Sequence, residues 1–353
     1  REIGDAIVVC GNRGLSVQVK SRAGDVASED RERRWINGKA GDAIRQARGT
    51  VRNLTNQPAV MRSLRGNEML IDGRVIKWTP VAIIDHPSPP NDLLLDEVGP
   101  DALALSRRDW EFLYEQLRST SAVIEYVERV AGYEPVPFDT EHLRYYELAQ
   151  EDLEATLNPK SPPKPVPPGG QRLSAPALPL VPAGQTDLEA HFVLRQIMED
   201  LATSRDNPEI TEEQRHLGLV ALDSVPVAQR EELGRHLLDL LAGVAAVPPA
   251  GVMTRFRRIV ELDGAEVILG ATNADANLAA ELIRSRVMLA HFRTGETREL
   301  SSHVTIGVLL THRRGQRPWD SNMAWVSGPI ELKAPELDRL RAFWSKAQPG
   351  WAD

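Results

Sequence analysis

Residues 4–20 read GDAIVVC, GNRG and LSVQVK, two apolar runs separated by a turn that contains Gly and Asn. Alternating β-branched residues on both sides of such a turn predict an antiparallel β-hairpin. If Cys10 and Leu15 close the turn, the residue numbers of each facing pair add up to 25. Facing residues lie on the same side of a sheet, so this register also predicts which side chains meet.

Three polar side chains lie on one side of this hairpin, near its open end. In the expected register Asp5 faces Lys20, and Gln18 lies on the same side, two residues before the lysine. Ile7 and Val9 share that side and the other side is wholly apolar, which indicates a sheet covered by helices on both faces. A carboxylate, a carboxamide and an ammonium group that converge on a largely buried sheet are typical of an active site.

The three side chains suit the hydrolysis of phosphodiester bonds. Carboxylate and carbonyl-type oxygens bind hard cations such as Mg²⁺, which activate water and neutralise charge on a phosphate. A lysine stabilises the charge that develops during the reaction. In these respects Asp5 and the tripeptide Gln18-Val19-Lys20 resemble the motif of the PD-(D/E)xK nuclease superfamily, which has the restriction-endonuclease-like fold. The glutamine resembles the Mrr-like branch, where Gln replaces the usual acidic residue.

The resemblance implies a metal-dependent nuclease with Asp5, Gln18 and Lys20 as catalytic residues. Mg²⁺ or Mn²⁺ would be held by Asp5, Gln18 and the main-chain carbonyl of Val19. DNA is the expected substrate, RNA stays open, and a homodimer is expected if two copies are needed to cut both strands. The family has a helix and a strand before the Asp position, whereas this chain starts four residues before Asp5. We therefore expect an N-terminally incomplete core, either because the chain is a fragment or because the core is reduced.

The next segment predicts a helix beside this site. Between residues 35 and 54 the apolar side chains recur with a period of about 3.6 residues. Lys39 and Gln46 are seven residues apart, so they lie along one edge of the apolar face. By the resemblance this edge lines the cleft. The expected nucleic-acid contacts are Lys39, Arg45, Gln46, Arg48 and Arg52. The alternative is a solvated helix flank whose charges pair with neighbouring acids.

The distribution of charge favours a nucleic-acid partner for the first part of the chain. The net charge of the whole chain is -8, which by itself argues against such a partner. Residues 1–80, however, hold 15 Lys or Arg against 9 Asp or Glu, and the remainder holds 27 against 41. Positive charge therefore collects around the nuclease-like motif, where it would contact phosphates without reading bases.

Composition narrows the class of protein further. The 353 residues are enough for two domains, each with its own core. The single cysteine, Cys10, excludes an internal disulfide and predicts a reducing, cytoplasmic location. No apolar run approaches the length of a membrane span, so no membrane contact is expected.

We expect an α/β nuclease-like domain with a mixed sheet over residues 1–150. A small hairpin is predicted over 68–78 around Asp72-Gly73, followed by the last strand of the core at 80–84. Ser106 is the expected N-cap of a helix that runs to residue 117, and a further helix is predicted over 122–130.

A Pro-rich linker is predicted over residues 158–185, because its prolines and glycines suit neither a helix nor a central strand. A separate α+β domain of unknown function is expected over 186–353. Its expected helices are 187–201, 228–244, 277–289 and 335–344, and its expected strands are 256–262, 266–269, 303–310 and 323–326.

A second function class competes with the enzyme. The carboxamide of Gln18 stands where the superfamily usually has an acid, and the acidic ligand of an upstream helix is missing. Both features are compatible with a catalytically inactive nuclease-like module that binds nucleic acid or protein in a defence or regulatory protein.

Overall fold

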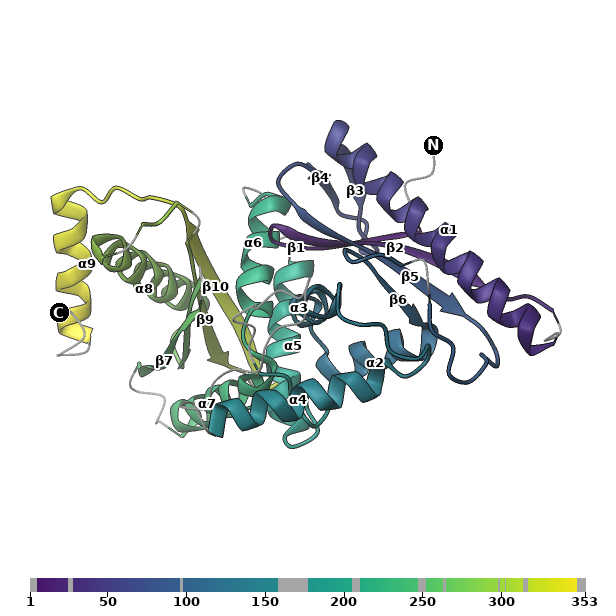
Figure 1. Cartoon of the computed structure of the whole chain (residues 1–353). Helices are drawn as coiled ribbons and strands as arrows, with labels where there is room; N and C mark the ends of the chain where they lie inside the picture. The colour runs from purple at the N-terminus through teal and green to yellow at the C-terminus, as the bar shows by residue number, and fades with distance from the viewer. Residues whose placement is uncertain are drawn as a thin grey trace. The chain divides into compact units, whose positions relative to one another are not determined.

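The computed structural model divides the chain into two compact units (Figure 1). Unit 1 contains residues 1–186 and 226–228, and unit 2 contains 187–225 and 229–353. The structure describes residues 5–24, 28–95, 98–157, 177–204, 210–246, 252–262, 265–297, 299–301, 303–313 and 317–347. No helix in these ranges is long and apolar enough to span a membrane.

Unit 1 is built on a mixed sheet with the strand order β1-β2-β5-β6 (Figure 1). Its strands are β1 (Ala6–Cys10), β2 (Arg13–Ser21), β5 (Lys77–Asp85) and β6 (Leu103–Ser106). β1 runs antiparallel to β2, whereas β2, β5 and β6 are parallel neighbours. The expected mixed α/β class is thus confirmed. The strand predicted at 80–84 is β5, but it is not the last of the sheet, because β6 pairs with its outer side.

Helices cover both faces of this sheet, as the apolar pattern of the hairpin predicts. The long helix α1 (Glu29–Asn56) packs Ile36 and Ala40 onto Ile84 on one face. The opposite face, which includes Leu15 and Val17, packs against three helices. These are α2 (Arg107–Leu117), α3 (Thr120–Val130) and α4 (Glu141–Leu157). Because both faces are covered, the middle of β2 and of β5 is continuously buried.

The register of the β1–β2 hairpin differs from the expected one by two residues. Cys10 pairs with Arg13 and Ala6 pairs with Val17, so facing residue numbers add up to 23. The turn is the two-residue Gly11-Asn12, and Gly11 has a φ of +62°, a conformation that glycine adopts at little cost. Because the shift is an even number of residues, the side chains keep the faces that the sequence predicted for them.

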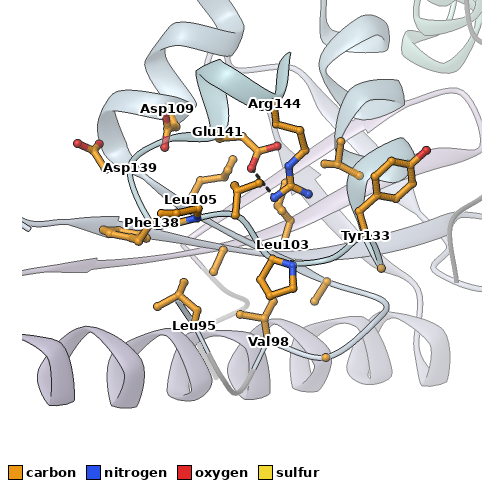
Figure 2. A pocket seen from close by; sticks show the side chains of 18 of the residues that line it. Leu95, Val98, Leu103, Leu105, Asp109, Tyr133, Phe138, Asp139, Glu141 and Arg144 are labelled. Carbon is orange, nitrogen blue, oxygen red and sulfur yellow. Dashed lines mark ion pairs between the residues drawn. The ribbon is translucent and has the colours of Figure 1, made fainter. Parts of the chain in front are cut away.

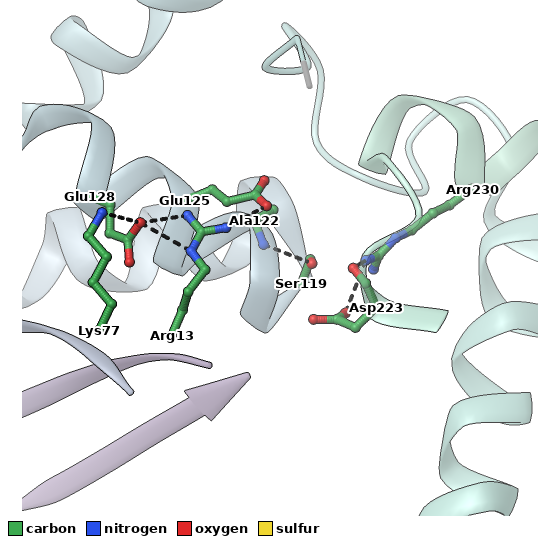
Figure 3. A network of polar contacts seen from close by, with 8 residues as sticks. All are labelled: Arg13, Lys77, Ser119, Ala122, Glu125, Glu128, Asp223 and Arg230. Carbon is green, nitrogen blue, oxygen red and sulfur yellow. Dashed lines mark hydrogen bonds and ion pairs between the residues drawn. The ribbon is translucent and has the colours of Figure 1, made fainter. Parts of the chain in front are cut away.

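Arg13 ties the turn of this hairpin to helix α3 (Figure 3). Its guanidinium donates to Glu128 Oε2 from Nε at 3.1 Å and from Nη2 at 2.8 Å. Nη1 donates to Glu125 Oε1 at 2.9 Å. Lys77 Nζ approaches the same Glu128 oxygen at 3.3 Å. The Glu128 side chain is only 2% exposed, so this network holds a buried carboxylate between the sheet and α3.

The hairpin predicted over 68–78 is wrong. The structure pairs β3 (Ala59–Arg62) with β4 (Glu68–Ile71), and the turn lies at 63–67. Asp72-Gly73 instead leads from β4 towards β5. Gly73 lies so close to α1 that a Cβ would be 2.6 Å from the backbone carbon of Leu54. Position 73 therefore requires glycine because the chain passes close to α1, and not because it forms a hairpin turn.

The helical predictions after the sheet hold. Ser106 caps α2, because its Oγ accepts the backbone N–H of Asp109 at 3.0 Å. The helix expected at 122–130 is α3. Residues 158–176 of the predicted linker lie outside the described residues. The last part of this predicted linker is attached to unit 1. The Ala183 N–H donates to the Gln116 carbonyl at 2.9 Å, and the Tyr145 hydroxyl donates to the Pro179 carbonyl at 2.8 Å.

Unit 2 has a sheet with the strand order β10-β9-β8-β7. Its elements are α5 (Leu188–Thr203), α6 (Glu212–Asp223), α7 (Val227–Ala245), β7 (Thr254–Leu262), β8 (Ala265–Thr272), α8 (Ala276–Thr297), β9 (Val304–His312), β10 (Trp319–Ser327) and α9 (Ala334–Ala347). β7 and β8 are antiparallel, and α8 then connects β8 to its parallel neighbour β9. Unit 2 therefore repeats the hairpin–helix–strand order of unit 1.

Candidate functional site

The clearest convergence of predicted site residues is between β2 and α1. Lys20 Nζ donates a hydrogen bond to Gln46 Oε1 at 2.7 Å. Lys20 is next to Ile84 in the parallel register, on the face that α1 covers. The apolar stripe of α1 faces the sheet, and this places Gln46 at the rim of the packed face, where a long lysine side chain reaches it. The structure thus brings the predicted lysine and the predicted helix-edge glutamine together.

Asp5 lies at the open end of the hairpin, directly before β1. Its Oδ2 accepts the backbone N–H of Val19 at 2.7 Å. Continuing the observed register by one pair places Asp5 opposite Gln18 instead of opposite Lys20. The Asp5 side chain is exposed, and it lies next to the backbone of the residue between Gln18 and Lys20. The acidic side chain therefore reaches the tripeptide that the resemblance singles out.

Gln18 is 5% exposed, which is unusual for a carboxamide. It lies on the face of β2 that α1 covers, as does Ser16, whose hydroxyl donates to the Ala47 carbonyl at 3.2 Å. Within the part of the chain that the structure describes, the Gln18 side chain makes no hydrogen bond. Buried polar groups usually have a partner, so this carboxamide is a candidate ligand contact.

The basic residues predicted on α1 are less available for a nucleic acid than the sequence suggests. Lys39 Nζ lies 3.7 Å from Asp42 Oδ2, and Arg45 forms an ion pair with the same carboxylate. Arg48 pairs with Asp101 and also donates to the Val98 carbonyl at 3.2 Å. These contacts match the alternative of an ion-paired helix flank. Arg52, the remaining basic residue among the predicted contacts, is exposed and forms no ion pair with any described residue.

Sequence reasoning missed the acids that neutralise these cations. Asp42 lies one turn from Lys39 and from Arg45 on α1, at the spacing at which helical side chains meet. That spacing was readable in the sequence. Asp101 precedes β6, and no local pattern relates it to Arg48, 53 residues earlier. Each of these exposed pairs contributes little to stability, because water screens both charges.

The oxygen atoms around Asp5 show whether the site suits a divalent cation. Asp5 supplies a carboxylate, Gln18 a carboxamide oxygen, and Val19 a backbone carbonyl on the side of β2 that faces β1. The described residues contain no group of three or more His, Cys, Asp or Glu side chains placed to hold a metal. Mg²⁺ keeps several waters and often takes only one or two carboxylates together with substrate phosphates. The chemistry of these donors therefore suits a weakly held Mg²⁺ or Mn²⁺ whose remaining coordination positions would be filled by water and a substrate phosphate.

A second polar cluster lies at the carboxyl ends of β2 and β5. The Glu32 carboxylate, 1% exposed, accepts from Arg22 Nε at 2.9 Å and from Arg22 Nη2 at 3.1 Å. His86 Nε2 lies 3.0 Å from the same carboxylate, and the Arg22 guanidinium lies over the Trp35 ring. Every member has a partner within the cluster, so it fastens the start of α1 to the sheet and offers no open coordination position.

Unit 2 has its own buried polar cluster between α8 and the sheet. His291, which is 0% exposed, contacts Thr305 Oγ1 through Nδ1 at 2.8 Å and the Gly328 carbonyl through Nε2 at 2.7 Å. The Thr305 hydroxyl donates to Glu266 at 3.4 Å, and His303 lies 4.0 Å from the same carboxylate. The bonds of His291 join α8, β9 and the end of β10, which indicates a structural role.

No protein-family model, curated protein or solved structure matches the chain. Its function is therefore inferred from its residues and their geometry alone.

Proposed function

We propose that unit 1 is a metal-dependent nuclease of the restriction-endonuclease-like fold that hydrolyses phosphodiester bonds, with DNA as its substrate. The observation that supports this proposal is the assembly around β2. The Asp5 carboxylate lies against the backbone of Val19, and Lys20 is bound to Gln46 of the helix that follows. The order of hairpin, crossover helix and parallel strand also agrees with this fold.

Each residue has a definite task in this proposal. Asp5, Gln18 and the Val19 carbonyl hold the cation, and the buried Gln18 carboxamide is oriented by the sheet and α1. A bound Mg²⁺ or Mn²⁺ supplies charge for the phosphate and activates water. Lys20 places its ammonium group beside the attacked phosphate, and Gln46 fixes the lysine through the 2.7 Å hydrogen bond. Among the predicted nucleic-acid contacts on α1, Arg52 is the cation without an ion pair to a described residue, and it would attract a nucleic-acid backbone.

Two observations favour the competing function, a nuclease-like module that binds without cutting. Lys39, Arg45 and Arg48 are all paired with carboxylates. Among the described residues, Asp5 is also the one carboxylate proposed to hold the metal, which makes cation binding weak. RNA as a substrate, a homodimeric state and a cytoplasmic location stay predictions.

The decisive experiment is cleavage of plasmid and single-stranded DNA by wild type and by Lys20→Ala, with Mg²⁺, with Mn²⁺ and with chelator. We expect metal-dependent cleavage by wild type and a loss of about a hundredfold or more for Lys20→Ala, which is the usual effect of removing one charge-stabilising group. DNA affinity should change little, since one lysine supplies only a small part of the phosphate attraction.

Lys333→Ala is the matched control, because it removes an exposed lysine from unit 2 and should leave cleavage unchanged. Equal cutting by wild type and Lys20→Ala would show that this site is not catalytic. DNA binding without cutting by wild type, in either metal, would favour the binding module.

A further inference from the structure

A recess in unit 1 lies beside β6, which is separated from β2 by strand β5 (Figure 2). Its volume is about 280 Å³, close to the lower end of the range of ligand pockets, roughly 300–1,000 Å³. It opens beside the exposed residues Gly99 and Pro135. Its apolar walls include Leu95, Val98, Leu103, Leu105 and Phe138. A compact, mainly apolar molecule fits such a space.

Arg144, in the first turn of α4, points into this recess (Figure 2). It is only 7% exposed, and its Nη2 lies 3.1 Å from Glu141 Oε2. The Arg144 Nε–H is buried and donates to no described residue. A buried charged donor without an acceptor is costly, so an anionic group placed here gains a charge-assisted hydrogen bond.

One buried carboxylate, that of Glu141, stands next to this guanidinium, and a second, that of Asp109, lines the same recess. Glu141 accepts the Tyr126 hydroxyl at 2.6 Å, and Asp109, 1% exposed, accepts from His142 Nδ1 at 3.1 Å. Burial raises the pKa of Glu141, Arg144 and Tyr126 oppose that rise, and the charge of Asp109 adds to it. Both carboxylates line the recess and their charges oppose each other, so a cationic group bound beside them relieves that repulsion.

We propose that this recess binds a free α-amino acid with an apolar side chain, in its zwitterionic form. The carboxylate of the ligand contacts Arg144, its ammonium group contacts Glu141 and Asp109, and its side chain packs against the apolar walls. A purely anionic ligand is repelled by the carboxylates, and a purely cationic ligand is repelled by Arg144. Only a molecule that carries both charges close together satisfies both kinds of group. The site is independent of the proposed nuclease centre.

The test is calorimetric titration of the full chain with L-leucine and with L-phenylalanine, in the absence of metal and nucleic acid. We expect saturable binding of at least one of them, with one molecule per chain. 3-Methylbutylamine lacks the carboxylate of leucine, and 4-methylpentanoate lacks its amine. Each should bind at least about tenfold more weakly, because each loses a charge-assisted contact. No binding of either amino acid, or equal binding of the two analogues, would overturn the proposal.

Variants locate the binding site. Arg144→Gln removes the guanidinium and should abolish binding of the amino acid that wild type binds. Because this change also removes the ion-pair partner of Glu141, Val98→Trp is a second variant, which fills the recess and keeps all its charges. It should abolish binding too, while Lys333→Ala retains the wild-type affinity. Wild-type affinity in Val98→Trp, or in an Arg144→Gln protein with a normal circular dichroism spectrum, would overturn the assignment.

Discussion

Replacing Arg13 by alanine should loosen the contact between the β1–β2 hairpin and α3. The change removes two hydrogen bonds to Glu128 Oε2, at 3.1 and 2.8 Å, and leaves Lys77 Nζ at 3.3 Å as the remaining cation (Figure 3). The Glu128 side chain is only 2% exposed, so water cannot solvate its charge. After the change, Lys77 is the cation that still faces the carboxylate. The Arg13 side chain is 25% exposed, and water will partly enter its place.

The expected loss of unfolding free energy follows from the exposed fractions of these two side chains. Removing one partner of a fully buried ion pair costs about 3–5 kcal/mol of unfolding free energy. Since Lys77 remains and Arg13 is partly solvated, we expect about 2–3 kcal/mol for Arg13→Ala. The double variant Arg13→Met with Glu128→Leu removes both charges and keeps much of the packed volume. It should cost less than about 1 kcal/mol, because no buried charge is left without a partner.

Native-state hydrogen exchange followed by mass spectrometry measures these costs locally, on peptides from β2 and α3. A local measurement is needed because the chain has two units, which need not unfold together. Peptides from unit 2 are the internal control and should keep their protection. The reasoning is refuted if the double variant is as destabilised as Arg13→Ala, or if Arg13→Ala leaves the protection of β2 and α3 unchanged.

Two further predictions concern other charged positions. The Arg74 guanidinium lowers the pKa of Asp72 to about 2, below its usual 3.8. This contact therefore stabilises the fold above pH 3.8 and is lost as the pH falls through about 2. Arg74→Ala should raise the pKa of Asp72, measured by NMR titration of its carboxyl carbon; an unchanged value would contradict the role of Arg74. Gln18→Glu adds a second carboxylate beside the proposed cation and should increase the rise in melting temperature that Mg²⁺ produces. A lack of any Mg²⁺-dependent shift in this variant would exclude a cation at Gln18.

The side of the sheet on which each hairpin residue lies could be predicted, but its register could not. Alternation of apolar residues fixes the faces, and a shift of two residues preserves them. The register depends on whether the turn holds two or four residues, and both Gly11 and Gly14 are compatible with a turn. Gly14 instead lies within β2, where a Cβ would be 2.7 Å from the Trp78 ring, a long-range contact that no local pattern reveals.

The same distinction applies to the candidate site. Helical periodicity placed Gln46 on one edge of the apolar face of α1, and the family resemblance implied that this edge lines the cleft. The structure joins Gln46 to Lys20 by a hydrogen bond. The ion pair of Arg48 with Asp101 joins segments that are 53 residues apart. Arg144 and Glu141 pair within one turn of α4, but the recess that encloses them is formed by distant segments. Local patterns therefore predict the faces of the elements, whereas the availability of each charge is decided by tertiary contacts.

The parallel pairing of β2 with β5 also has a consequence for the order of folding. Asp5, Gln18, Lys20 and Gln46 all lie within a hairpin and one helix, so their segments form through short-range contacts. The position of Lys20 in the sheet, however, is fixed by Ile84, 64 residues later. Closing such a long loop is slow compared with forming a hairpin or a helix. The candidate site therefore acquires its final geometry only when β5 pairs with β2. A nascent chain that ends before β5 should contain all four site residues, but they should not yet be aligned.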